Sequence, residues 1–268
     1  MAIVLDNITY TYGMGTPFEK TALHGISLTI ENGEFLGVIG HTGSGKSTFV
    51  QHLNGLLHPT TGTVTVNGVD ISASTEEAKK MRHKVGMVFQ YPEHQLFEET
   101  IAEDIAFGPK NLGLSADEVD ERVRDAMKFV GLDYNTYAER SPFHLSGGQM
   151  RRVAIAGVVA MNPDFLVLDE PSAGLDPFGR EEIFEEIISL HKEKGITVIL
   201  VSHNMEDISR MASRLVVLDK GRIVLDGEPM DIFNNHRDEL QAVGVDVPPV
   251  SVTMEYLREQ GLDVSNRV

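Results

Sequence analysis

Apolar and polar residues alternate along three stretches near the N-terminus. Residues 3–12 and 23–39 show the alternation on either side of short glycine-containing turns, and residues 61–71 repeat it around Asn67-Gly68. A period of two is typical of β-strands with one buried face, and Asn-Gly between two such runs predicts a tight hairpin. We therefore expect a β-rich segment at the start of the chain.

Four shorter runs are apolar at nearly every position. They cover residues 35–39, 85–89, 165–168 and 196–201. Runs of this length without alternation are typical of parallel strands that are buried on both faces. A helical pattern that begins at Pro177 and stops at Gly195 separates the last two runs, so the order of elements predicts an α/β fold.

Residues 100 to about 143 carry a helical period instead. Thr100 and Ser115 each stand three positions before a glutamate, which is the capping-box pattern of a helix start. The first of these helices runs towards Phe107, and the second stops at Gly131. We expect a helical insertion whose Val and Met side chains pack in the core.

The C-terminal part begins with another hairpin pattern. Residues 215–219 and 222–226 flank the turn Lys220-Gly221. Short helical patterns follow from Pro229 on, so we expect a small C-terminal appendage.

A glycine-rich loop joins the apolar run 35–39 to an apolar-patterned helix. The loop consists of Gly40, His41, Thr42, Gly43, Ser44, Gly45, Lys46, Ser47 and Thr48. Between a strand and a helix, GxxxxGK followed by Ser wraps a phosphate with backbone N–H groups and adds the partial charge of the helix N-terminus. Lys46 would reach the β- and γ-phosphates of a nucleotide, and the Ser47 hydroxyl would hold Mg²⁺. A dinucleotide-binding loop is disfavoured, because Thr48 stands where that motif has a third glycine.

Polar residues stand directly after three of the apolar runs. Asp169 would hold Mg²⁺ directly or through water, and Glu170 would polarise the attacking water. His203 could hydrogen-bond the γ-phosphate. Gln90 could contact Mg²⁺ or a water molecule through its amide oxygen, although a glutamine alone is a weak signal. Each could instead be a polar residue at a strand end, and for the two acids the phosphate loop upstream favours the catalytic interpretation.

A second helix start has residues suited to an anion. Ser146, Gly147, Gly148 and Gln149 open a helical pattern that ends before Pro163. Serine and glycine at a helix start expose backbone N–H groups to an anion. An ordinary serine cap is the alternative, and the phosphate loop earlier in the chain favours the anion site.

Aromatic residues upstream of the phosphate loop are candidates for stacking on a purine ring. They are Tyr10, Tyr12 and Phe18. Each could equally be a packing residue of a β-strand, in which aromatic side chains are common. The residues alone leave this choice open.

Composition restricts the partners and the location. The 40 acidic and 23 basic residues give a net charge of −17, which repels nucleic acid and offers no basic anchor for a membrane surface. Because the chain has no cysteine, it has no disulfide framework and no thiolate metal site, which fits the cytosol. The apolar runs are too short to span a bilayer, and the N-terminus lacks a signal-peptide pattern. We therefore expect no nucleic acid partner, and any membrane role to come through partners.

The order of these motifs resembles that of an ABC-type ATP-binding cassette. The loop 40–48, Gln90, LSGGQ at 145–149, FLVLDE at 165–170, SAGLD at 172–176 and His203 carry the resemblance, which covers residues 1 to about 230. It implies an α/β P-loop NTPase core with an N-terminal β-subdomain, a helical signature subdomain at about 92–160 and a small C-terminal helical extension. The implied domains are an ATP-binding domain at 1–229 and an extension at 230–268 that contributes to dimerisation.

Cassettes of this family form head-to-tail dimers with two ATP molecules at the interface. The resemblance implies that the phosphate loop and Glu170 of one chain face the signature residues 146–149 of the other. It also implies that Asp176, in the SAGLD loop, belongs to the nucleotide site. Among the aromatic candidates, Tyr12 matches the adenine-stacking position of the family best.

The tract after Gln90 carries a narrower resemblance. Residues 90–100, continuing to Ala106-Phe107-Gly108-Pro109, are similar to the second ATPase type of energy-coupling factor transporters, which import vitamins and transition metals. This resemblance implies a heterodimer with a second cassette ATPase, beneath a transmembrane coupling protein that docks near the tract. Small substrate-binding membrane proteins complete such a complex. The chain would then lie peripherally at the cytoplasmic face of the cell membrane and hydrolyse ATP as a translocase.

Three other functions compete with this interpretation. The chain could serve an ordinary ABC importer or exporter, from which only the tract after Gln90 and the C-terminal tail distinguish it. It could be a soluble cassette of the DNA-repair or translation-factor kind, against which the negative charge argues. It could also bind nucleotide without hydrolysing it, against which Glu170 and His203 argue.

Overall fold

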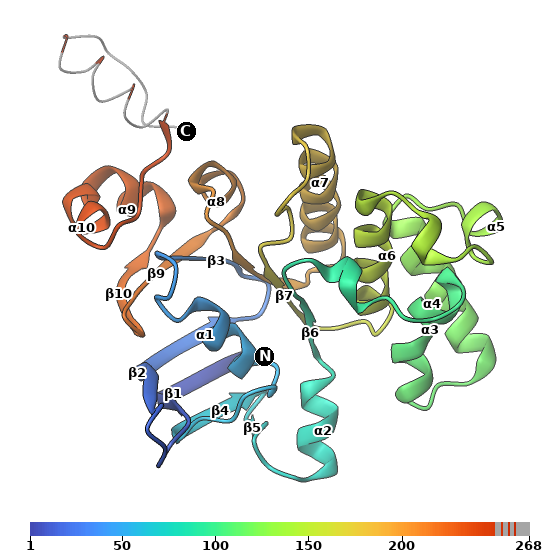
Figure 1. The fold of residues 1–268 in the computed structure, drawn as a ribbon, viewed down its shortest axis with the longest axis horizontal. Coiled ribbons are helices and arrows are strands. Elements are labelled where there is room, and N and C mark those ends of the chain that lie inside the picture. The colour runs from blue at the N-terminus through green and yellow to red at the C-terminus, as the bar shows by residue number, and fades with distance from the viewer. Residues whose placement is uncertain (250–252, 254–256, 258–259, 261–268) are drawn as a thin grey trace. The chain divides into compact units, whose positions relative to one another are not determined.

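Two units make up the chain in the computed structural model, which describes residues 1–249 together with residues 253, 257 and 260 (Figure 1). The first unit joins Met1–Arg82 to the chain from Thr197 onward, and the second is His83–Ile196. The predicted domain boundaries at 92–160 and 229 stay predictions. Most of the predicted extension beyond residue 249 lies outside the described residues.

An antiparallel sheet in the first unit confirms the alternating pattern. It contains β1 (Ala2–Tyr12), β2 (Lys20–Glu31), β4 (Thr61–Val66) and β5 (Val69–Asp70), in the order β2-β1-β4-β5. Ile3, Leu5 and Ile8 of β1 are fully buried or nearly so, as the period-two pattern requires. Asn67 and Gly68 both have positive φ, which is the backbone of the tight turn that Asn-Gly favours.

Parallel strands carry the rest of the first unit. The strand β3 (Phe35–Ile39) pairs with β8 (Thr197–Val201) and β9 (Arg214–Asp219), parallel to both, and β10 (Arg222–Gly227) runs antiparallel to β9. The helices are α1 (Lys46–Leu53), α2 (Glu76–Arg82), α8 (Met205–Met211), α9 (Pro229–Asn235) and α10 (Arg237–Ala242). Gly37 permits close packing of α8 on β3, because a Cβ there would lie 2.9 Å from Ile208.

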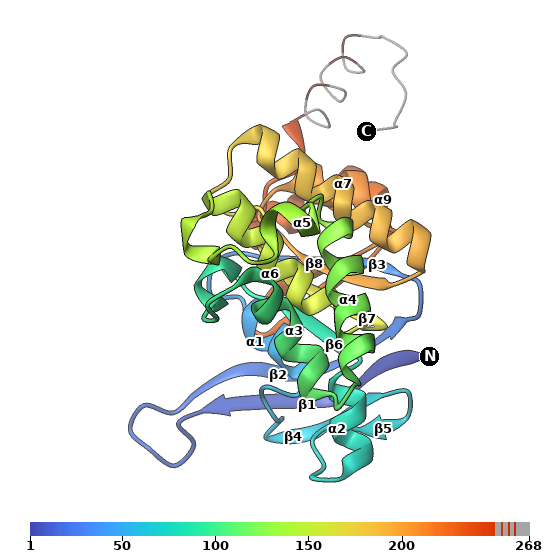
Figure 2. The same ribbon diagram turned by 90° about the vertical axis from the view of Figure 1, so that its right-hand side faces the viewer.

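The second unit combines two parallel strands with helices. The strands β6 (Val85–Val88) and β7 (Phe165–Asp169) are buried at every position, as the continuous apolar runs predict. The helices are α3 (Ile101–Asn111), α4 (Ala116–Phe129), α5 (Tyr134–Tyr137), α6 (Gly147–Val159) and α7 (Pro177–Lys194), with short 3₁₀ turns η1 (Pro92–Gln95) and η2 (Pro142–His144). The helices α3 and α4 run side by side (Figure 2). The helix α3 also packs on α6, and a Cβ at Gly108 would lie 2.7 Å from Met161, which follows α6.

Three helices depart from the sequence predictions. The helix that begins at Thr100 continues past Phe107 to Asn111 and contains Pro109, because the Leu112 N–H still bonds the Gly108 carbonyl and continues the helical turn. The helices α2 and α8 were not predicted.

Among the described residues, no helix combines the length and hydropathy needed to cross a membrane.

Candidate functional site

The glycine-rich loop adopts a backbone that only glycine tolerates at several positions. Gly40, Gly43 and Gly45 have φ values of 154°, 84° and 105°. A Cβ at Gly40 would also lie 2.3 Å from the Leu218 carbonyl oxygen. Gly45 is the N-cap of α1, and no side chain in the described part of the chain caps this helix, so its first N–H groups are available to an anion.

Lys46 lies over the same loop. Its side chain is 7% exposed, and its ammonium donates hydrogen bonds to the carbonyls of Gly40 (2.7 Å) and His41 (3.1 Å). These bonds bring the positive charge back over the loop backbone instead of into solvent. The loop and its lysine therefore form the phosphate-binding arrangement that the motif predicts.

The turn between β9 and β10 supports the phosphate loop from outside the motif. The Gly221 N–H donates to the Ser44 carbonyl at 2.8 Å, and the carboxylate of Asp219 bonds Nε2 of His41 at 2.9 Å. A Cβ at Gly221 would lie 2.2 Å from the Ala22 carbonyl oxygen, so this position also requires glycine. The sequence indicated only a hairpin turn here, since nothing in the local pattern connects it to residues 40–48.

The three aromatic candidates have different surroundings. The Tyr12 hydroxyl lies 3.1 Å from Thr48 Oγ1, at the end of the loop, and its side chain is 41% exposed. The Tyr10 ring packs edge-on between the rings of Tyr12 and His52, with centroids 4.7 and 4.8 Å away. Phe18 is 87% exposed in the turn between β1 and β2. Tyr12 is therefore the candidate that directly contacts the phosphate loop.

His52 completes this aromatic cluster. It is fully buried on α1, and burial lowers the pKa of its imidazole, so the ring is neutral at neutral pH. Its Nδ1 lies 2.7 Å from the Thr48 carbonyl oxygen, which only a protonated Nδ1 can bond. His52 thus fixes the packing beneath Tyr10 without adding charge near the loop.

His203 follows β8 at the same sheet edge as the start of the phosphate loop. Val38 of β3 pairs with Val201 of β8 in a parallel register, so Gly40 and His203 both stand two residues beyond this pair. His203 is exposed and lines a cleft of about 580 Å³ together with Arg237 and Gln241. The first unit thus brings Tyr12, the phosphate loop and His203 into one region.

The second unit places Gln90, Asp169 and Glu170 at one edge in the same way. Val88 of β6 pairs with Leu168 of β7, also in parallel, so Gln90 and Glu170 both stand two residues beyond the pair. Asp169 is 7% exposed at the end of β7. Glu170 has a left-handed backbone with φ of 53°, which is uncommon outside glycine and is found often at functional sites.

The second helix start forms a complete capping box. The Ser146 hydroxyl accepts the Gln149 N–H at 3.3 Å, and Oε1 of Gln149 accepts the Ser146 N–H at 3.1 Å. A Cβ at Gly147 or Gly148 would meet nothing within 4 Å, so packing within this chain does not require glycine there. The serine cap and the open helix start are therefore both present.

Arg152 and residues of α7 border this helix start. Together with Ser146, Gly148 and Gly179, Arg152 lines a cleft of about 480 Å³. The carboxylate of Asp176 accepts the Gly179 N–H at 2.7 Å and so caps α7. The structure thus gives Asp176 a local role, whereas its predicted role at the nucleotide stays a prediction.

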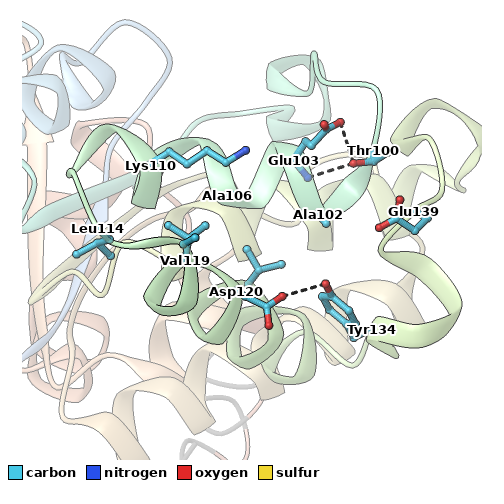
Figure 3. Close-up of a pocket in the computed structure, with 12 residues that line it drawn as sticks. Thr100, Ala102, Glu103, Ala106, Lys110, Leu114, Val119, Asp120, Tyr134 and Glu139 are labelled. Atoms are coloured by element: carbon cyan, nitrogen blue, oxygen red, sulfur yellow. Dashed lines mark hydrogen bonds between the residues drawn. The ribbon is translucent and has the colours of Figure 1, made fainter.

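A further cleft of about 460 Å³ lies between α3 and α4 (Figure 3). Ala106 of α3 and Val119 of α4 line it, as do the hydrogen-bonded pairs Thr100–Glu103 and Asp120–Tyr134. The residues that line it include no glycine. This cleft therefore lacks the phosphate-binding features of the loop 40–48.

Comparison with known proteins identifies the family. A profile of the ABC transporter family matches residues 23–173. The energy-coupling factor transporter ATP-binding protein EcfA2 of Clostridium tetani is 55% identical over 268 residues, which cover 100% of this chain and 93% of that protein. The protein of the same name from Clostridium perfringens is 54% identical, with 100% and 94% covered.

A solved structure agrees with this result. It is cbiO1 from Clostridium perfringens, described as part of the ABC transporter complex cbiONQ, and it matches with a TM-score of 0.78 and 36% identity over 94% of this chain and 98% of that chain. The predicted P-loop α/β fold and both family resemblances are thereby confirmed. The chain belongs to the ABC transporter family, among the energy-coupling factor transporter ATP-binding proteins.

Proposed function

We propose that this chain is the ATP-hydrolysing subunit of an energy-coupling factor importer and that it energises the uptake of vitamins or metal ions through a membrane coupling subunit. The observation that carries the proposal is the match to energy-coupling factor transporter ATP-binding proteins, at 55% identity over all 268 residues. ATP binding closes a dimer of ATPases and hydrolysis reopens it. The membrane subunit converts this cycle into transport, while the chain lies peripherally at the cytoplasmic face of the membrane.

The loop 40–48 binds the phosphates of ATP. Its backbone N–H groups and the uncapped start of α1 bond the phosphate oxygens, and Lys46 neutralises the β- and γ-phosphates. Tyr12 stacks on the adenine ring. Its bond to Thr48 and its half-exposed ring support this role over the packed Tyr10.

Mg²⁺ would bind together with ATP, and the groups that would hold it are the Ser47 hydroxyl, Asp169 and Gln90. No group of three or more His, Asp or Glu side chains in the described part of the chain could hold a metal alone. This donor set fits Mg²⁺, which ordinarily uses one or two carboxylates together with substrate phosphates and water. When bound, the ion neutralises charge on the phosphate oxygens.

Glu170 is the general base for the attacking water, and His203 donates a hydrogen bond to the γ-phosphate. Glu170 follows the buried strand β7 in a left-handed backbone conformation, and such strain persists where the surrounding structure holds a functional group in place. In phosphoryl transfer the protein contributes mainly position and charge. Glu170 and His203 supply both the position and the charge.

The signature residues bind the ATP that the partner ATPase holds. Gly147 and Gly148 support this role, because no contact with the described residues requires glycine at these positions and a side chain would cover the start of α6. Ser146 and Gln149 keep the helix start in shape through their capping box. Asp176 contributes at the same interface by capping α7.

The tract after Gln90 docks the transmembrane coupling subunit. Tyr91, Phe97 and Phe107 are 44%, 57% and 46% exposed, and the rings of Phe97 and Phe107 lie edge to face at 4.9 Å. Clustered exposed aromatic side chains are typical of protein contact surfaces. The other proposed partners are a second cassette ATPase, which makes a heterodimer, and small substrate-binding membrane proteins.

Affinity purification tests the partners. The tagged chain is purified from its native cell in mild detergent, and the co-purifying proteins are identified by mass spectrometry. A second cassette ATPase, one multi-span protein and several small membrane proteins are expected. Two copies of a dedicated permease would instead indicate an ordinary ABC transporter, and soluble partners alone would contradict transport.

Phosphate release from the same assembly tests the chemistry. Lys46→Ala, which removes the phosphate-binding charge, defines the hydrolysis that remains when this chain's site does not work. Glu170→Gln should lower the hydrolysis above this background by about 10²- to 10⁴-fold, with ATP binding retained, because it removes the general base. Near-normal turnover of Glu170→Gln would contradict the role of Glu170.

A further inference from the structure

Arg151, on α6, is a buried arginine whose partners lie on two other segments. Its side chain is 2% exposed. The guanidinium donates from Nε and Nη2 to the carboxylate of Glu93, at 3.2 and 3.2 Å to Oε2 and 3.3 Å to Oε1. A buried charge is costly unless it is paired and hydrogen-bonded, and Glu93 supplies both.

The remaining donors of Arg151 bond the backbone directly after Glu170. Nη1 donates to the carbonyls of Pro171 at 3.0 Å and Ala173 at 2.8 Å. A guanidinium has five N–H donors in a fixed planar fork, and these contacts use the whole fork. Arg151 therefore ties three segments together: the signature helix α6, the 3₁₀ turn η1 that contains Glu93, and the loop 170–173.

The loop 170–173 is held from two sides. Within the loop, the Ala173 N–H donates to the Glu170 carbonyl at 3.1 Å and closes a turn. From outside, Arg151 donates hydrogen bonds to the carbonyls of Pro171 and Ala173. The strained backbone of Glu170, with φ of 53°, lies at the start of this turn. Such a conformation persists only when its neighbours are fixed.

We propose that Arg151 is a positioning residue that fixes the direction of the Glu170 carboxylate and links it, through Glu93, to the exposed aromatic tract after Gln90. The inference rests on the proposed role of Glu170 as general base and adds a connection that the sequence motifs do not contain. Glu93 stands three residues after Gln90, in the middle of the tract that carries Tyr91 and Phe97. A partner bound to this tract thereby acts on the Glu170 turn through one side chain.

The planar fork is what makes Arg151 suited to this role. A lysine would keep the charge, but its ammonium is a compact donor that cannot bond the Glu93 carboxylate and two separate carbonyls in one plane. Removal of Arg151 would leave the Glu93 carboxylate without its cation and would release both carbonyls. Removal of the charge of Glu93 alone would loosen only one side of the arrangement.

The test compares four variants of the full-length chain in its purified native assembly: Arg151→Lys, Arg151→Met, Glu93→Gln, and Arg151→Met with Glu93→Gln. Arg124→Met is the matched control, because Arg124 lies in the same unit but pairs with Asp120 at the surface, where both side chains are 50% exposed. ATP hydrolysis is measured as kcat and as KM for ATP. Thermal unfolding of each variant is measured in parallel.

Both Arg151 variants should lower kcat by about 10- to 100-fold and leave KM for ATP within about 2-fold, because a displaced catalytic group slows chemistry while the loop 40–48 still binds nucleotide. Glu93→Gln keeps an acceptor of the same shape and should cost less. The double variant should be no slower than Arg151→Met, since the two residues act as one unit. Arg124→Met should leave both kinetic constants unchanged.

Several outcomes would overturn the proposal. An unchanged kcat in the Arg151 variants would do so, as would additive losses in the double variant or a loss in kcat that matches the fraction unfolded. Should the Arg151 variants fail to fold, a normal kcat for folded Glu93→Gln would also overturn it. Glu170→Gln is assayed alongside, and retained ATP turnover in this variant would contradict the proposed function itself. Loss of turnover in Glu170→Gln together with normal kcat in the Arg151 variants would contradict only this inference.

Discussion

Glu186 gives the chain a pH-dependent stability that one substitution should remove. Its side chain lies on α7 and is 16% exposed, and Nη1 of Arg152 is 3.8 Å from its Oε1. Arg152 makes a closer ion pair with Glu182. Oε2 of Glu186 has no hydrogen-bond partner among the residues that the structure describes. Burial, reinforced by Glu182 and opposed by Arg152, raises the pKa of Glu186 from 4.5 to about 7.

The direction and the size of the effect follow from proton linkage. Between about pH 4.5 and 7, folded Glu186 keeps a proton that the unfolded chain has lost, so the folded state loses stability as pH rises through this window. A difference of one in pKa corresponds to about 1.4 kcal/mol, which makes about 3 kcal/mol the upper limit of the loss. Because the side chain is partly exposed, we expect about 1–2 kcal/mol.

Glu186→Gln cannot ionise, so its stability relative to the unmodified chain should increase from pH 5 to pH 8 by this amount. Urea unfolding at both pH values measures the difference, and thermal unfolding at pH 8 should show a gain of a few degrees, at about 2–4 °C per kcal/mol. Glu185→Gln is the control, because this substitution removes the same carboxylate charge one position away, where the side chain is exposed. Equal behaviour of the two variants at both pH values would refute the reasoning.

Two further substitutions test the fold around the site. Gly221→Ala should weaken ATP binding and destabilise the chain by about 1–3 kcal/mol, because Gly221 has φ of 73° and a Cβ there would lie 2.2 Å from the Ala22 carbonyl oxygen. Isothermal titration with ATP measures the first effect, and urea unfolding measures the second. Wild-type affinity for ATP would contradict the proposal that this turn supports Ser44. Ser115→Ala should cost about 1 kcal/mol in urea unfolding without changing hydrolysis, because it removes the hydroxyl that accepts the Glu118 N–H at the start of α4, whereas the backbone N–H of residue 115 still bonds the Glu118 carboxylate. A cost smaller than about 0.3 kcal/mol would mean that water replaces the cap.

The phosphate loop and the strand-end acids were predictable from the sequence because their signals are local. Residues 40–48 combine a buried strand, glycines with special backbone angles and a helix within one continuous stretch. Asp169 is the last of the five buried positions of β7 and directly follows its four apolar residues. Parallel strands bring their carboxyl ends to one edge, so Gln90 and Glu170 could be expected near each other before their register was known.

The supporting contacts could not be predicted, since their partners are distant in sequence. Asp219 bonds His41 across 178 positions, and Arg151 bonds Glu93 across 58. Neither pair leaves a periodic pattern or a motif, and an arginine in an amphipathic helix is ordinarily a surface residue. The missed helix α8 has a different cause: its cap, Asn204, directly follows the strand-end residues 202–203, so the strand hid the helix start.

The predicted residues of the site are the ones proposed to act on the nucleotide, and the unpredicted residues hold them in place. Lys46 and Glu170 carry the proposed chemistry, and each is held by a neighbour outside its own motif. The Gly221 turn holds the loop around Lys46, and Arg151 bonds the turn that follows Glu170. Substitution of a residue that carries the chemistry should abolish ATP binding or hydrolysis. Substitution of a supporting residue, such as Gly221 or Arg151, should change the affinity for ATP or the rate of hydrolysis without abolishing it. Two chains with identical motifs can therefore differ in turnover, and the difference has to be sought in residues that no motif contains.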